Sequence, residues 1–483
     1  MNIVLATLNA RYSHASLALR YLHANMGELR EQTHILEFVL GINPSFIAER
    51  LLEYKPSIIG FGVYIWNVEE ITAVVSLLKR VAPEIKIILG GPEVSYESAE
   101  QAIVQCADYL VAGWGEVTLP RLCREILDGF APRLKIHAGE QGSLDSLRLP
   151  YDLYTDQDIA HRNIYVEASR GCPFKCEFCL SALDKTAVPF ALDRFLAEME
   201  ALYRRGARCF KFVDRTFNLN ITSSARILQF FLDKINDDPA DRLFVHFELV
   251  PDCLPEALKQ LIAQFPAGSL QLEIGIQTLN PEVQQIISRK QDDAKSLSNL
   301  AWLRKNSNAH LHADLIVGLP GEDLASFAAG FDKLCAFRPH EIQVGILKRL
   351  RGTPIIRHTK MYGLIFDPAP PYRVLCTDLI DFLSMQRLVR FGRYWDLIGN
   401  SGRFAAILPT LLGETPFANF LALSDWLYAE TDTTGGISLS RLEGLVAQWQ
   451  MVGPLKGSNG DVKAIQPDSL PTKIPRRQAR HLE

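Results

Sequence analysis

The sequence predicts an α/β protein in which a doubly wound, Rossmann-like parallel sheet is followed by a partial (βα)6 barrel and a small α-helical C-terminal domain. Two observations carry this prediction. Short β-branched or apolar runs alternate with longer amphipathic runs in two separate series, which is typical of parallel sheets covered by helices. Beyond the second series, apolar and aromatic residues recur at helical spacing instead.

The first series covers residues 1–130 and begins with the strand-like run NIVLATL. The later runs THILEFVL, SIIGFGVYI, KIILGG and YLVAG are each followed by an amphipathic segment. Strands that alternate with helices in this way predict a doubly wound parallel sheet. Residues 131–160 lose the alternation and gain Pro, Gly and Asp, so they are predicted to be a linker.

The second series predicts a barrel over residues 161–360. Its six strand-like runs fit a partial barrel, because a complete eight-fold barrel usually needs about 250 residues. The expected strands lie near residues 164–168, 209–213, 244–249, 271–276, 311–317 and 341–346.

Two further segments complete the chain. Residues 371–450 contain helical, aromatic-rich runs and predict a small α-helical domain. Residues 451–483, which include Lys473, Arg476 and Arg477, have the composition of a disordered basic tail.

Composition sets limits on partners and location. With 483 residues, 48% of them hydrophobic, the chain is long enough for two or three domains. A net charge of -4 favours neither nucleic acid nor a membrane as a partner. No run approaches the roughly 18 apolar residues of a membrane-spanning helix, and the N-terminus does not resemble a targeting signal. Nine mostly scattered cysteines are typical of reduced thiols, so a cytoplasmic enzyme is expected.

Three of the cysteines cluster just after a predicted strand. The run EASRGCPFKCEFCLSA places Cys172, Cys176 and Cys179 in a C-x3-C-x2-C spacing, at the end of a barrel where active sites collect. Three thiolates can hold one iron–sulfur cluster and leave one iron without a protein ligand. A zinc site is the first alternative, but His161 and Cys209 lie outside the usual zinc spacing. A redox C-x2-C pair is the second.

These cysteines, with the aromatic Phe178 before the last one, resemble the signature of the radical S-adenosylmethionine (SAM) superfamily. The resemblance implies a [4Fe-4S] cluster held by Cys172, Cys176 and Cys179, with the amino and carboxylate groups of SAM on the fourth iron. One electron then cleaves SAM to methionine and a 5'-deoxyadenosyl radical. A low-potential electron donor such as flavodoxin or ferredoxin is the partner expected for this chemistry.

Weaker motifs of the same superfamily suggest which side chains contact SAM. Asp214 could equally cap a helix, and Glu273 could equally form a salt bridge inside the barrel. Gln277 stands where related sequences carry an acid, so GIQT departs from the pattern. The candidate SAM contacts are Phe178, Asp214, Thr216, Asn218, Glu248, Glu273 and Gln277.

In the first domain, the informative residues follow the strands, because doubly wound sheets bind ligands at the carboxyl ends of their strands. Neither GGPEVS nor AGWGE is a G-x-G-x-x-G fingerprint, so a dinucleotide fits poorly. Glycines in these places are also common turn residues, whatever the ligand. The candidate ligand contacts are Asn9, Tyr12, Ser13, Val63, Gly90, Gly91, Pro92, Gly113, Gly115 and Glu116.

A sheet domain with GGPEVS and AGWGE directly before such a barrel is similar to the cobalamin-binding radical SAM enzymes of the class B methyltransferase type. The resemblance covers residues 1 to about 360, implies cobalamin at the contacts named above, and extends to a helical C-terminal segment of one uncharacterised branch. Methylthiotransferases share the layout but carry three additional cysteines in the first domain, where this chain has only Cys106 and Cys123.

Many cobalamin proteins ligate cobalt through the histidine of a D-x-H-x-x-G loop after the first strand. The corresponding run here is NARYSHAS, in which His14 lacks both the acid and the glycine. Such a histidine normally needs a partner on its other nitrogen. We therefore expect cobalt without a histidine ligand below it, its lower face covered by residues such as Asn9, Tyr12 or Val63.

The resemblance implies a methyltransferase that acts on an unactivated carbon, or on phosphorus, of a small-molecule or peptide substrate. Two alternatives remain open at this stage. One is a cobalamin-dependent radical rearrangement or cyclisation without methyl transfer. The other is a non-catalytic cobalamin or redox sensor. The sequence does not indicate which substrate is used.

Overall fold

The computed structural model describes residues 2–184, 186–238, 240 and 242–452. The chain divides into two compact units, Met1–Thr434 and Gly435–Glu483, and α16 (Leu439–Val452) is the described element of the second. The predicted basic tail at 451–483 lies outside the described residues except for its first two positions. The predicted α/β fold class is confirmed: the chain has two six-stranded sheets, then helices.

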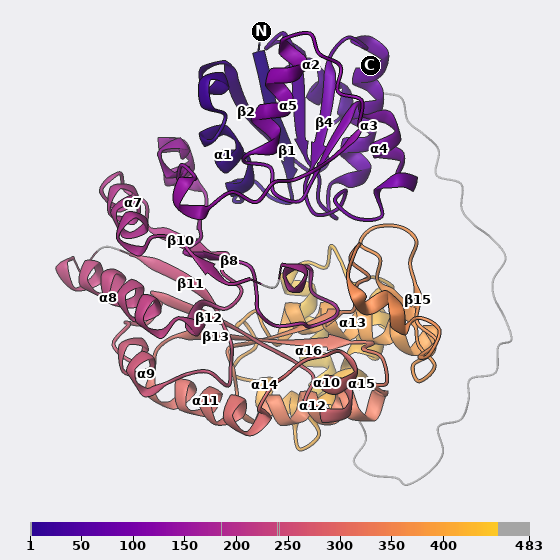
Figure 1. Ribbon diagram of the computed structural model, residues 1–483. Helices are drawn as coiled ribbons and strands as arrows, with labels where there is room; N and C mark the ends of the chain where they lie inside the picture. The colour runs from indigo at the N-terminus through magenta and orange to yellow at the C-terminus, as the bar shows by residue number, and fades with distance from the viewer. Residues whose placement is uncertain (1, 185, 239, 241, 453–483) are drawn as a thin grey trace, which may run out of the picture. The chain divides into compact units, whose positions relative to one another are not determined.

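The first sheet has six parallel strands in the order β2-β1-β3-β4-β5-β6 (Figure 1). Apolar side chains from both of its faces form two separate cores, one against α2, α3 and α4 and the other against α1 and α5, so the sheet is doubly wound. The strands are β1 (Asn2–Asn9), β2 (Thr33–Val39), β3 (Pro56–Gly62), β4 (Lys86–Gly90), β5 (Tyr109–Ala112) and β6 (Ile136–Ala138). The helices are α1 (Leu17–Ala24), α2 (Pro44–Leu52), α3 (Val68–Val81), α4 (Ala102–Cys106) and α5 (Thr118–Leu127).

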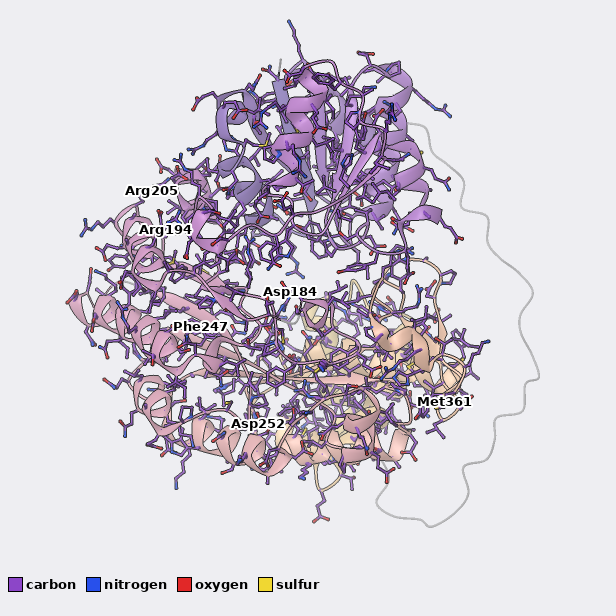
Figure 2. All side chains as sticks on the ribbon, in the orientation of Figure 1. Asp184, Arg194, Arg205, Phe247, Asp252 and Met361 are labelled. Carbon is purple, nitrogen blue, oxygen red and sulfur yellow. The ribbon has the colours of Figure 1, made fainter. Side chains whose placement is uncertain are left out.

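The segment 131–160 differs from the predicted linker. Its β6 pairs in parallel with β5 and extends the first sheet. Farther along, Arg194 and Arg205 (Figure 2) donate hydrogen bonds to the carbonyls of Leu147 and Tyr154, at 2.7 and 2.5 Å. A strand of three residues at a sheet edge is too short to give an alternating pattern, which is why the sequence did not reveal it.

The second sheet is the barrel, and its six parallel strands follow the order β14-β13-β12-β11-β10-β7. All six strands expected from the sequence are present. They are β7 (Ile164–Val166), β10 (Cys209–Phe212), β11 (Phe244–Leu249), β12 (Leu270–Gln277), β13 (His310–Val317) and β14 (Glu341–Ile346). The intervening helices are α7 (Leu192–Arg204), α8 (Ile221–Asp237), α9 (Glu256–Ile262), α10 (Pro281–Ile286), α11 (Asp293–Asn306) and α12 (Leu324–Ala336), and a short antiparallel pair, β8 (Ser169–Arg170) and β9 (Val188–Pro189), flanks the cysteine loop.

Aromatic packing fixes the barrel strands to their helices. Phe247 (Figure 2) is fully buried, and its ring centroid lies 3.8 Å from that of Phe217 and 4.5 Å from that of Phe212. Buried aromatic side chains of this size dominate the energetics of a core. The strand ends that carry the site residues are therefore held on a rigid base.

The C-terminal helices cover the open edge of the barrel. Asn400 accepts a hydrogen bond from the Ile342 backbone N–H at 2.9 Å and donates one to the Ile342 carbonyl at 3.0 Å, so it pairs with both polar groups of this edge-strand residue. Gly392 lets the helix approach, because a Cβ there would lie 3.0 Å from the Val344 carbonyl oxygen. The elements are β15 (Ile365–Phe366), β16 (Val374–Cys376), α13 (Phe382–Ile398), α14 (Leu408–Leu412) and α15 (Pro416–Thr431).

No helix among the described residues is sufficiently long and apolar to cross a membrane.

Candidate functional site

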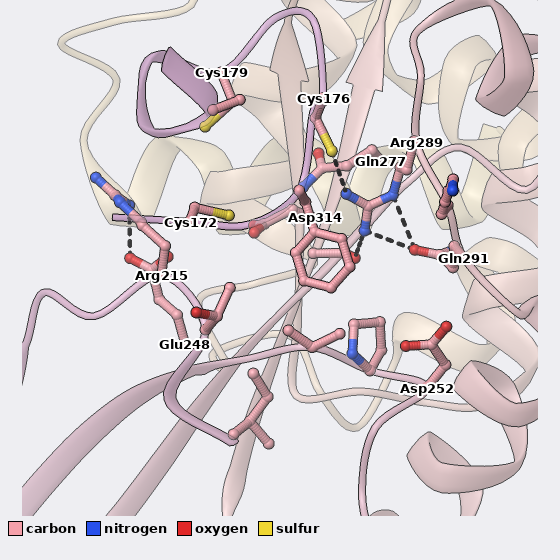
Figure 3. Close-up of a pocket in the computed structure, with 18 of the residues that line it drawn as sticks. Cys172, Cys176, Cys179, Arg215, Glu248, Asp252, Gln277, Arg289, Gln291 and Asp314 are labelled. Atoms are coloured by element: carbon pink, nitrogen blue, oxygen red, sulfur yellow. Dashed lines mark hydrogen bonds and ion pairs between the residues drawn. The ribbon is translucent and has the colours of Figure 1, made fainter. Parts of the chain in front are cut away.

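The three clustered cysteines lie around one pocket. The loop that carries them follows β7, and Cys172, Cys176 and Cys179 all line a pocket of about 220 Å³ (Figure 3). Cys172 and Cys176 are buried and Cys179 is half-buried. The pocket also takes residues from the turns after β10 and β11 and the last residue of β12, Gln277, so it lies at the carboxyl ends of the barrel strands, where barrel active sites form.

This donor set fits an iron–sulfur cluster. Within the described part of the chain, no three His, Cys, Asp or Glu side chains converge as ligands of a single metal ion. A cluster has a different requirement, because each cysteine binds a different iron. Burial raises the pKa of the Cys172 and Cys176 thiols, and binding to iron removes this penalty by stabilising the thiolate. Three soft ligands around one pocket leave a fourth iron open to another ligand.

Asp214 does not line the pocket. Its hydrogen bonds support the segment that leads into the cysteine loop. Its carboxylate accepts hydrogen bonds from the Ala168 backbone N–H at 3.0 Å and the Ser169 hydroxyl at 2.6 Å. Burial raises the pKa of Asp214 to about 7, although these hydrogen bonds act in the opposite direction. Asp214 does not cap α8, whose N-cap is Asn220. Its position makes it a support for the strand end that leads into the loop.

Asn218 has a similar supporting position. Its side-chain amide donates to the Val250 carbonyl at 2.9 Å and accepts from the Val250 N–H at 2.8 Å. The side chain is fully buried and fixes the turn after β11. Val250 itself lines the pocket, so Asn218 acts on the pocket wall through the backbone.

The other five candidate SAM contacts do line the pocket. Glu248 and Glu273 are partners in the register of β11 and β12, so their side chains project from the same face of the sheet. Glu248 forms an ion pair with Arg215 at 2.7 Å, and Glu273 lies 3.2 Å from His246 Nε2. The five are Phe178, Thr216, Glu248, Glu273 and Gln277.

Asp314 adds a third carboxylate to this wall. It is the register partner of Gly275 on the neighbouring strand, two positions beyond Glu273. Burial and the nearby Glu273 and Glu248 raise the pKa of Asp314 well above its ordinary value. The hydrogen bond to His246 has the opposite effect on Glu273, whose pKa lies below its ordinary value. Neighbouring carboxylates whose pKa values shift in opposite directions can share a proton. The carboxylates of this pocket wall can therefore bind a cationic or hydroxyl-bearing group.

Gln277 occupies an unusual backbone conformation. Its φ is +68°, and the β12–β13 register shifts between Gly275 and Gln277. A non-glycine residue is uncommon in this region of φ, and a bulge of this kind re-aims side chains next to active sites. The bulge brings the Gln277 amide toward Gly275, where an added Cβ would lie 2.7 Å from Gln277 Nε2. Gln277 therefore lines the pocket from a bulge at the end of β12.

Two arginines in the pocket were not predicted from the sequence. Arg289 Nη1 lies 3.7 Å from Cys176 Sγ, and the guanidinium also donates to the Gly275 carbonyl and to Gln291. Arg215 pairs with Glu248. Arg215 directly follows Asp214, so its place after a barrel strand was a usable signal. Arg289 follows a short helix rather than a strand, and no pattern marks it.

Glu177 is a second unpredicted feature, inside the cysteine motif itself. It is buried and accepts hydrogen bonds from His358 Nε2 at 2.7 Å and the Ser288 hydroxyl at 2.5 Å, and it pairs with Arg357. Its backbone N–H donates to the Ile287 carbonyl at 3.1 Å. A charged side chain in the middle of the motif therefore faces inward and ties the cysteine loop to two distant segments.

In the first domain, Gly91 is required by close packing. It has a φ of +108°, and a Cβ at this position would lie 2.4 Å from the Val63 carbonyl oxygen. The Val63 N–H donates to the Gly90 carbonyl at 2.8 Å, so the ends of β3 and β4 are joined here. At Gly115 a Cβ would meet the Leu22 side chain at 2.7 Å. Packing within the domain therefore requires both glycines, which stand at the carboxyl edge of the sheet, where doubly wound sheets generally bind ligands.

The loop after β1 is held largely by internal hydrogen bonds. Asn9 donates to the His14 carbonyl and to Glu37, each at 2.9 Å, and the Ser13 carbonyl accepts from the Asn163 N–H. Tyr12 remains about half exposed. His14 Nδ1 lies 2.6 Å from the Tyr165 hydroxyl. Burial lowers the pKa of His14, as do the nearby Lys211 and Arg11.

Glu116 connects the AGWGE segment to the cysteine loop. It forms an ion pair at 2.6 Å with Arg170, which stands two residues before Cys172. Arg170 also pairs with Glu167 and lies over the Trp114 ring at 4.8 Å. Trp66, by contrast, stacks on Tyr64 with ring centroids 4.5 Å apart. Arg170 therefore holds a candidate cobalamin loop and the cysteine loop in one arrangement.

Three protein families match separate parts of the chain. Residues 3–123 match the B12 binding domain, residues 166–334 match the radical SAM superfamily, and residues 360–443 match a protein of unknown function, DUF4080. The chain thus carries a B12-binding domain followed by a radical SAM domain. The predictions of cobalamin, SAM and a [4Fe-4S] cluster as cofactors are confirmed at the level of these domains.

The curated relatives of this chain are distant in sequence. An uncharacterised methyltransferase of Pyrococcus horikoshii is 25% identical over 332 residues, which are 63% of this chain and 70% of that protein. The cobalamin-dependent radical SAM methyltransferase TokK of Streptomyces tokunonensis is 24% identical over 348 residues, which are 66% of this chain. The match spans about half of the length of TokK.

Among solved structures, the radical SAM methyltransferase TsrM of Kitasatospora setae, bound to tryptophan and a SAM analogue, has a similar fold. The TM-score is 0.61 at 17% identity, and the match covers 94% of this chain and 100% of TsrM. TsrM with cobalamin and a [4Fe-4S] cluster bound gives a TM-score of 0.59. The arrangement of a sheet domain followed by a barrel is therefore shared with a solved structure.

Proposed function

We propose that this chain, a cobalamin-binding radical SAM enzyme of the methyltransferase-like type, transfers a methyl group to an unactivated carbon, or to phosphorus, of a small-molecule or peptide substrate. The observation that carries the proposal is the single pocket that the three motif cysteines line, in a barrel that follows a B12-binding domain. When bound, the cofactors supply the radical and methyl-donor chemistry.

The roles of the residues follow from their places around the pocket. Cys172, Cys176 and Cys179 hold three irons of the cluster, and Phe178 covers it. Thr216, Glu248, Glu273 and Gln277 orient SAM, with Arg215 neutralising Glu248. Asp214 and Asn218 act indirectly, because they fix the backbone that carries these side chains.

Cobalamin binds at the carboxyl edge of the first sheet in this proposal. At four positions the absence of a Cβ lets the backbone approach a large planar ligand, and Pro92 contacts it beside them. The four are Gly90, Gly91, Gly113 and Gly115. Asn9, Tyr12, Ser13, Val63 and Glu116 complete the edge. The reducing electron, which radical SAM enzymes generally need, comes from flavodoxin or ferredoxin, in keeping with the predicted cytoplasmic location.

A test that needs no substrate separates the three functions considered. Protein reconstituted anaerobically with iron, sulfide and cobalamin is reduced and incubated with SAM labelled in its methyl group. A methyltransferase moves the label to cobalamin and releases S-adenosylhomocysteine. A rearrangement enzyme releases only methionine and 5'-deoxyadenosine, and a sensor releases neither. Absence of label on cobalamin in protein with full iron and cobalamin content would refute the methyltransferase proposal.

A further inference from the structure

One short segment of the chain contacts both loops that are proposed to hold cofactors. We call residues 349–358, which follow β14, the bridging segment. Near its start it contacts the loop after β4 in the first domain, residues 91–97, which we call the β4 loop. At its end it contacts the cysteine loop, residues 172–183. The bridging segment therefore connects the candidate cobalamin site to the candidate cluster site.

Glu93 joins the β4 loop to the bridging segment. Its side chain is only 3% exposed, and its Oε1 accepts hydrogen bonds from Arg351 Nε at 2.8 Å and from the Tyr372 hydroxyl at 2.6 Å. Arg351 also donates to the Tyr372 hydroxyl at 3.0 Å, so the three side chains form a closed triangle. A buried carboxylate needs partners of this kind, because an unpaired charge in the interior is costly. The β4 loop is therefore anchored to residues outside its own domain.

Tyr372 is held in a backbone conformation that few aromatic residues adopt. Its φ is +56°, which lies in the left-handed region that is uncommon for bulky side chains. Its carbonyl accepts a hydrogen bond from the Arg349 N–H at 2.9 Å, and the Arg351 guanidinium lies over its ring at 4.9 Å. Strain of this kind persists where several contacts fix one position, and it is often found at functional sites.

A second set of contacts lies beside this triangle. Glu97 forms an ion pair with Arg349 at 2.6 Å and accepts a hydrogen bond from the Gly352 N–H at 3.3 Å. Gly352 has a φ of +80°, and a Cβ at this position would lie 2.3 Å from the Tyr96 ring. Only glycine fits here, so the bridging segment and the β4 loop are closely packed.

The β4 loop in turn contacts the neighbouring loops of the first sheet. The Glu93 N–H donates to the carbonyl of Val63, after β3, at 3.4 Å. The Ser95 hydroxyl accepts a hydrogen bond from the N–H of Gly113, after β5, at 3.1 Å. Val63 and Gly113 are both candidate cobalamin contacts. The position of the β4 loop therefore affects three adjacent strand ends of the proposed cobalamin edge.

The far end of the bridging segment is fixed to the cysteine loop. The Ile355 N–H donates to the Glu177 carbonyl at 3.0 Å. Arg357 and His358 pair with the Glu177 carboxylate. Glu177 stands between two of the motif cysteines, so these contacts hold the middle of the motif. The same segment therefore carries contacts to Glu93 in one cofactor loop and to Glu177 in the other.

The bridging segment is compact and internally hydrogen-bonded. The Thr353 N–H and hydroxyl both donate to the Leu350 carbonyl, at 3.2 and 2.5 Å, and Pro354–His358 form a 3-10 helix. Thr353 and Ile355 are buried. Close-packed interiors have low compressibility and transmit displacement. A shift at one end of the segment should therefore reach the other end.

We infer that the bridging segment sets the distance between cobalamin and the cluster, with Arg351 and Tyr372 as its positioning residues. This inference rests on the proposed function, because it requires both cofactors in one protein. Chemistry between two bound groups depends closely on their geometry, and a displacement of about 1 Å can slow it by about a hundredfold. Tyr372 lies in the part of the chain that matches the family of unknown function. That region therefore acts on the cobalamin site through Glu93.

The test measures the distance between the cofactors directly. Full-length protein reconstituted anaerobically with iron, sulfide and cobalamin is treated with dithionite, so that the reduced cluster and cob(II)alamin each carry an unpaired spin. Pulsed electron paramagnetic resonance (EPR) gives the distance between the two spins and its spread. The variant is Tyr372→Phe, which removes only the hydroxyl. The matched control is Tyr394→Phe, which removes a buried hydroxyl in α13 that donates to the Thr433 carbonyl at 2.8 Å.

Wild type and Tyr394→Phe should give one narrow distance, whereas Tyr372→Phe should give a broader distribution. Tyr372→Phe should also transfer label from methyl-labelled SAM to cobalamin about tenfold more slowly. Its release of 5'-deoxyadenosine from SAM in the absence of cobalamin should match wild type, because the cluster pocket is unchanged.

The same distance distribution and the same rate of label transfer in Tyr372→Phe and Tyr394→Phe would overturn the inference. If Tyr372→Phe does not fold, Glu93→Gln decides in the same way, since it keeps the size of the side chain and removes the charge that pairs with Arg351. Wild-type protein that binds both cofactors but transfers no label counts against the proposed methyl transfer alone, because the distance measurement still tests the positioning role.

Discussion

His358 Nε2 lies 2.7 Å from Glu177 Oε2, although the two residues are 181 positions apart in the chain. Both are buried, and Glu177 stands between two of the motif cysteines. The contact makes the position of the cysteine loop depend on the segment that leads into the C-terminal region.

Replacing Glu177 by Ala should destabilise the protein by about 1–3 kcal/mol, because His358 and Ser288 lose a buried acceptor. The amount of iron retained should fall as well, since the cysteine loop loses its side-chain contacts to His358, Ser288 and Arg357. Thermal unfolding of the apoprotein and iron content after reconstitution measure the two effects. Glu140→Ala is the control, as it also removes a paired carboxylate, but one whose partner is Arg121, away from the contacts of Glu177. Normal iron content in Glu177→Ala would show that the contact does not position the loop.

The cluster ligands can be tested directly. Anaerobic wild-type protein should hold about four irons per chain and absorb in the visible blue range. Replacement of Cys172, Cys176 and Cys179 by Ala should abolish both. Cys106→Ala and Cys253→Ala, at exposed thiols, should change neither. Full iron loading in the triple variant would contradict the assignment.

A bulky residue at Gly91 should abolish cobalamin binding while the barrel keeps its iron. The added side chain would collide with the Val63 carbonyl, 2.4 Å from the Cβ position, and push the β4 loop into the ligand edge. Equilibrium dialysis of Gly91→Val with cobalamin measures the loss. Gly330→Ala, where a Cβ meets open space, should bind normally. Unchanged affinity in Gly91→Val would place cobalamin elsewhere.

The lower face of cobalt should carry no histidine nitrogen. His14 lacks the acid and the glycine of the D-x-H-x-x-G loop, and its Nδ1 lies 2.6 Å from the Tyr165 hydroxyl of the barrel. The EPR spectrum of bound cob(II)alamin should therefore lack nitrogen superhyperfine splitting, and His14→Ala should leave it unaltered. Splitting that disappears in His14→Ala would show that this histidine ligates cobalt.

Because of Glu322, the free energy of unfolding should fall as the pH rises. Burial raises its pKa to about 7 from 4.5, and its Oε2 is one of the buried atoms without a hydrogen-bond partner in the described structure. The folded protein binds this proton more tightly than the unfolded chain, so the stabilisation is complete below pH 4.5 and is lost as the pH approaches 7. The loss is at most about 3 kcal/mol. Urea unfolding of wild type and Glu322→Gln should show stabilities that diverge over this range; parallel curves would reject the shift.

Four of the barrel strands, β10 to β13, could be predicted because each is a strand-like run with a helix after it. The end of β13 shows this well, since LIVG has no competing helical pattern. The strand at Ile136–Ala138 could not be predicted, because its pairing with β5 depends on the tertiary fold rather than on its own three residues.

Within the candidate site, the spacing of cysteines in the sequence identified the three cluster ligands. Glu177, by contrast, is recognised only from its burial in the structure. A carboxylate between cysteines looks exposed in the sequence, because acidic residues are rarely buried without partners. Its partners, His358 and Ser288, come from segments far along the chain. Asp214 was a candidate SAM contact or helix cap, and its carboxylate accepts two hydrogen bonds from the segment before the cysteine loop.

The hydrogen bonds between Asn400 and Ile342 bear on aggregation. A partial barrel has a free edge at β14, and an unpaired strand edge is a template for a second chain. Asn400 occupies both backbone groups of Ile342, and α13 lies over the neighbouring Val344. Removal of the helices from Phe382 onward should therefore leave this edge open to intermolecular β-pairing.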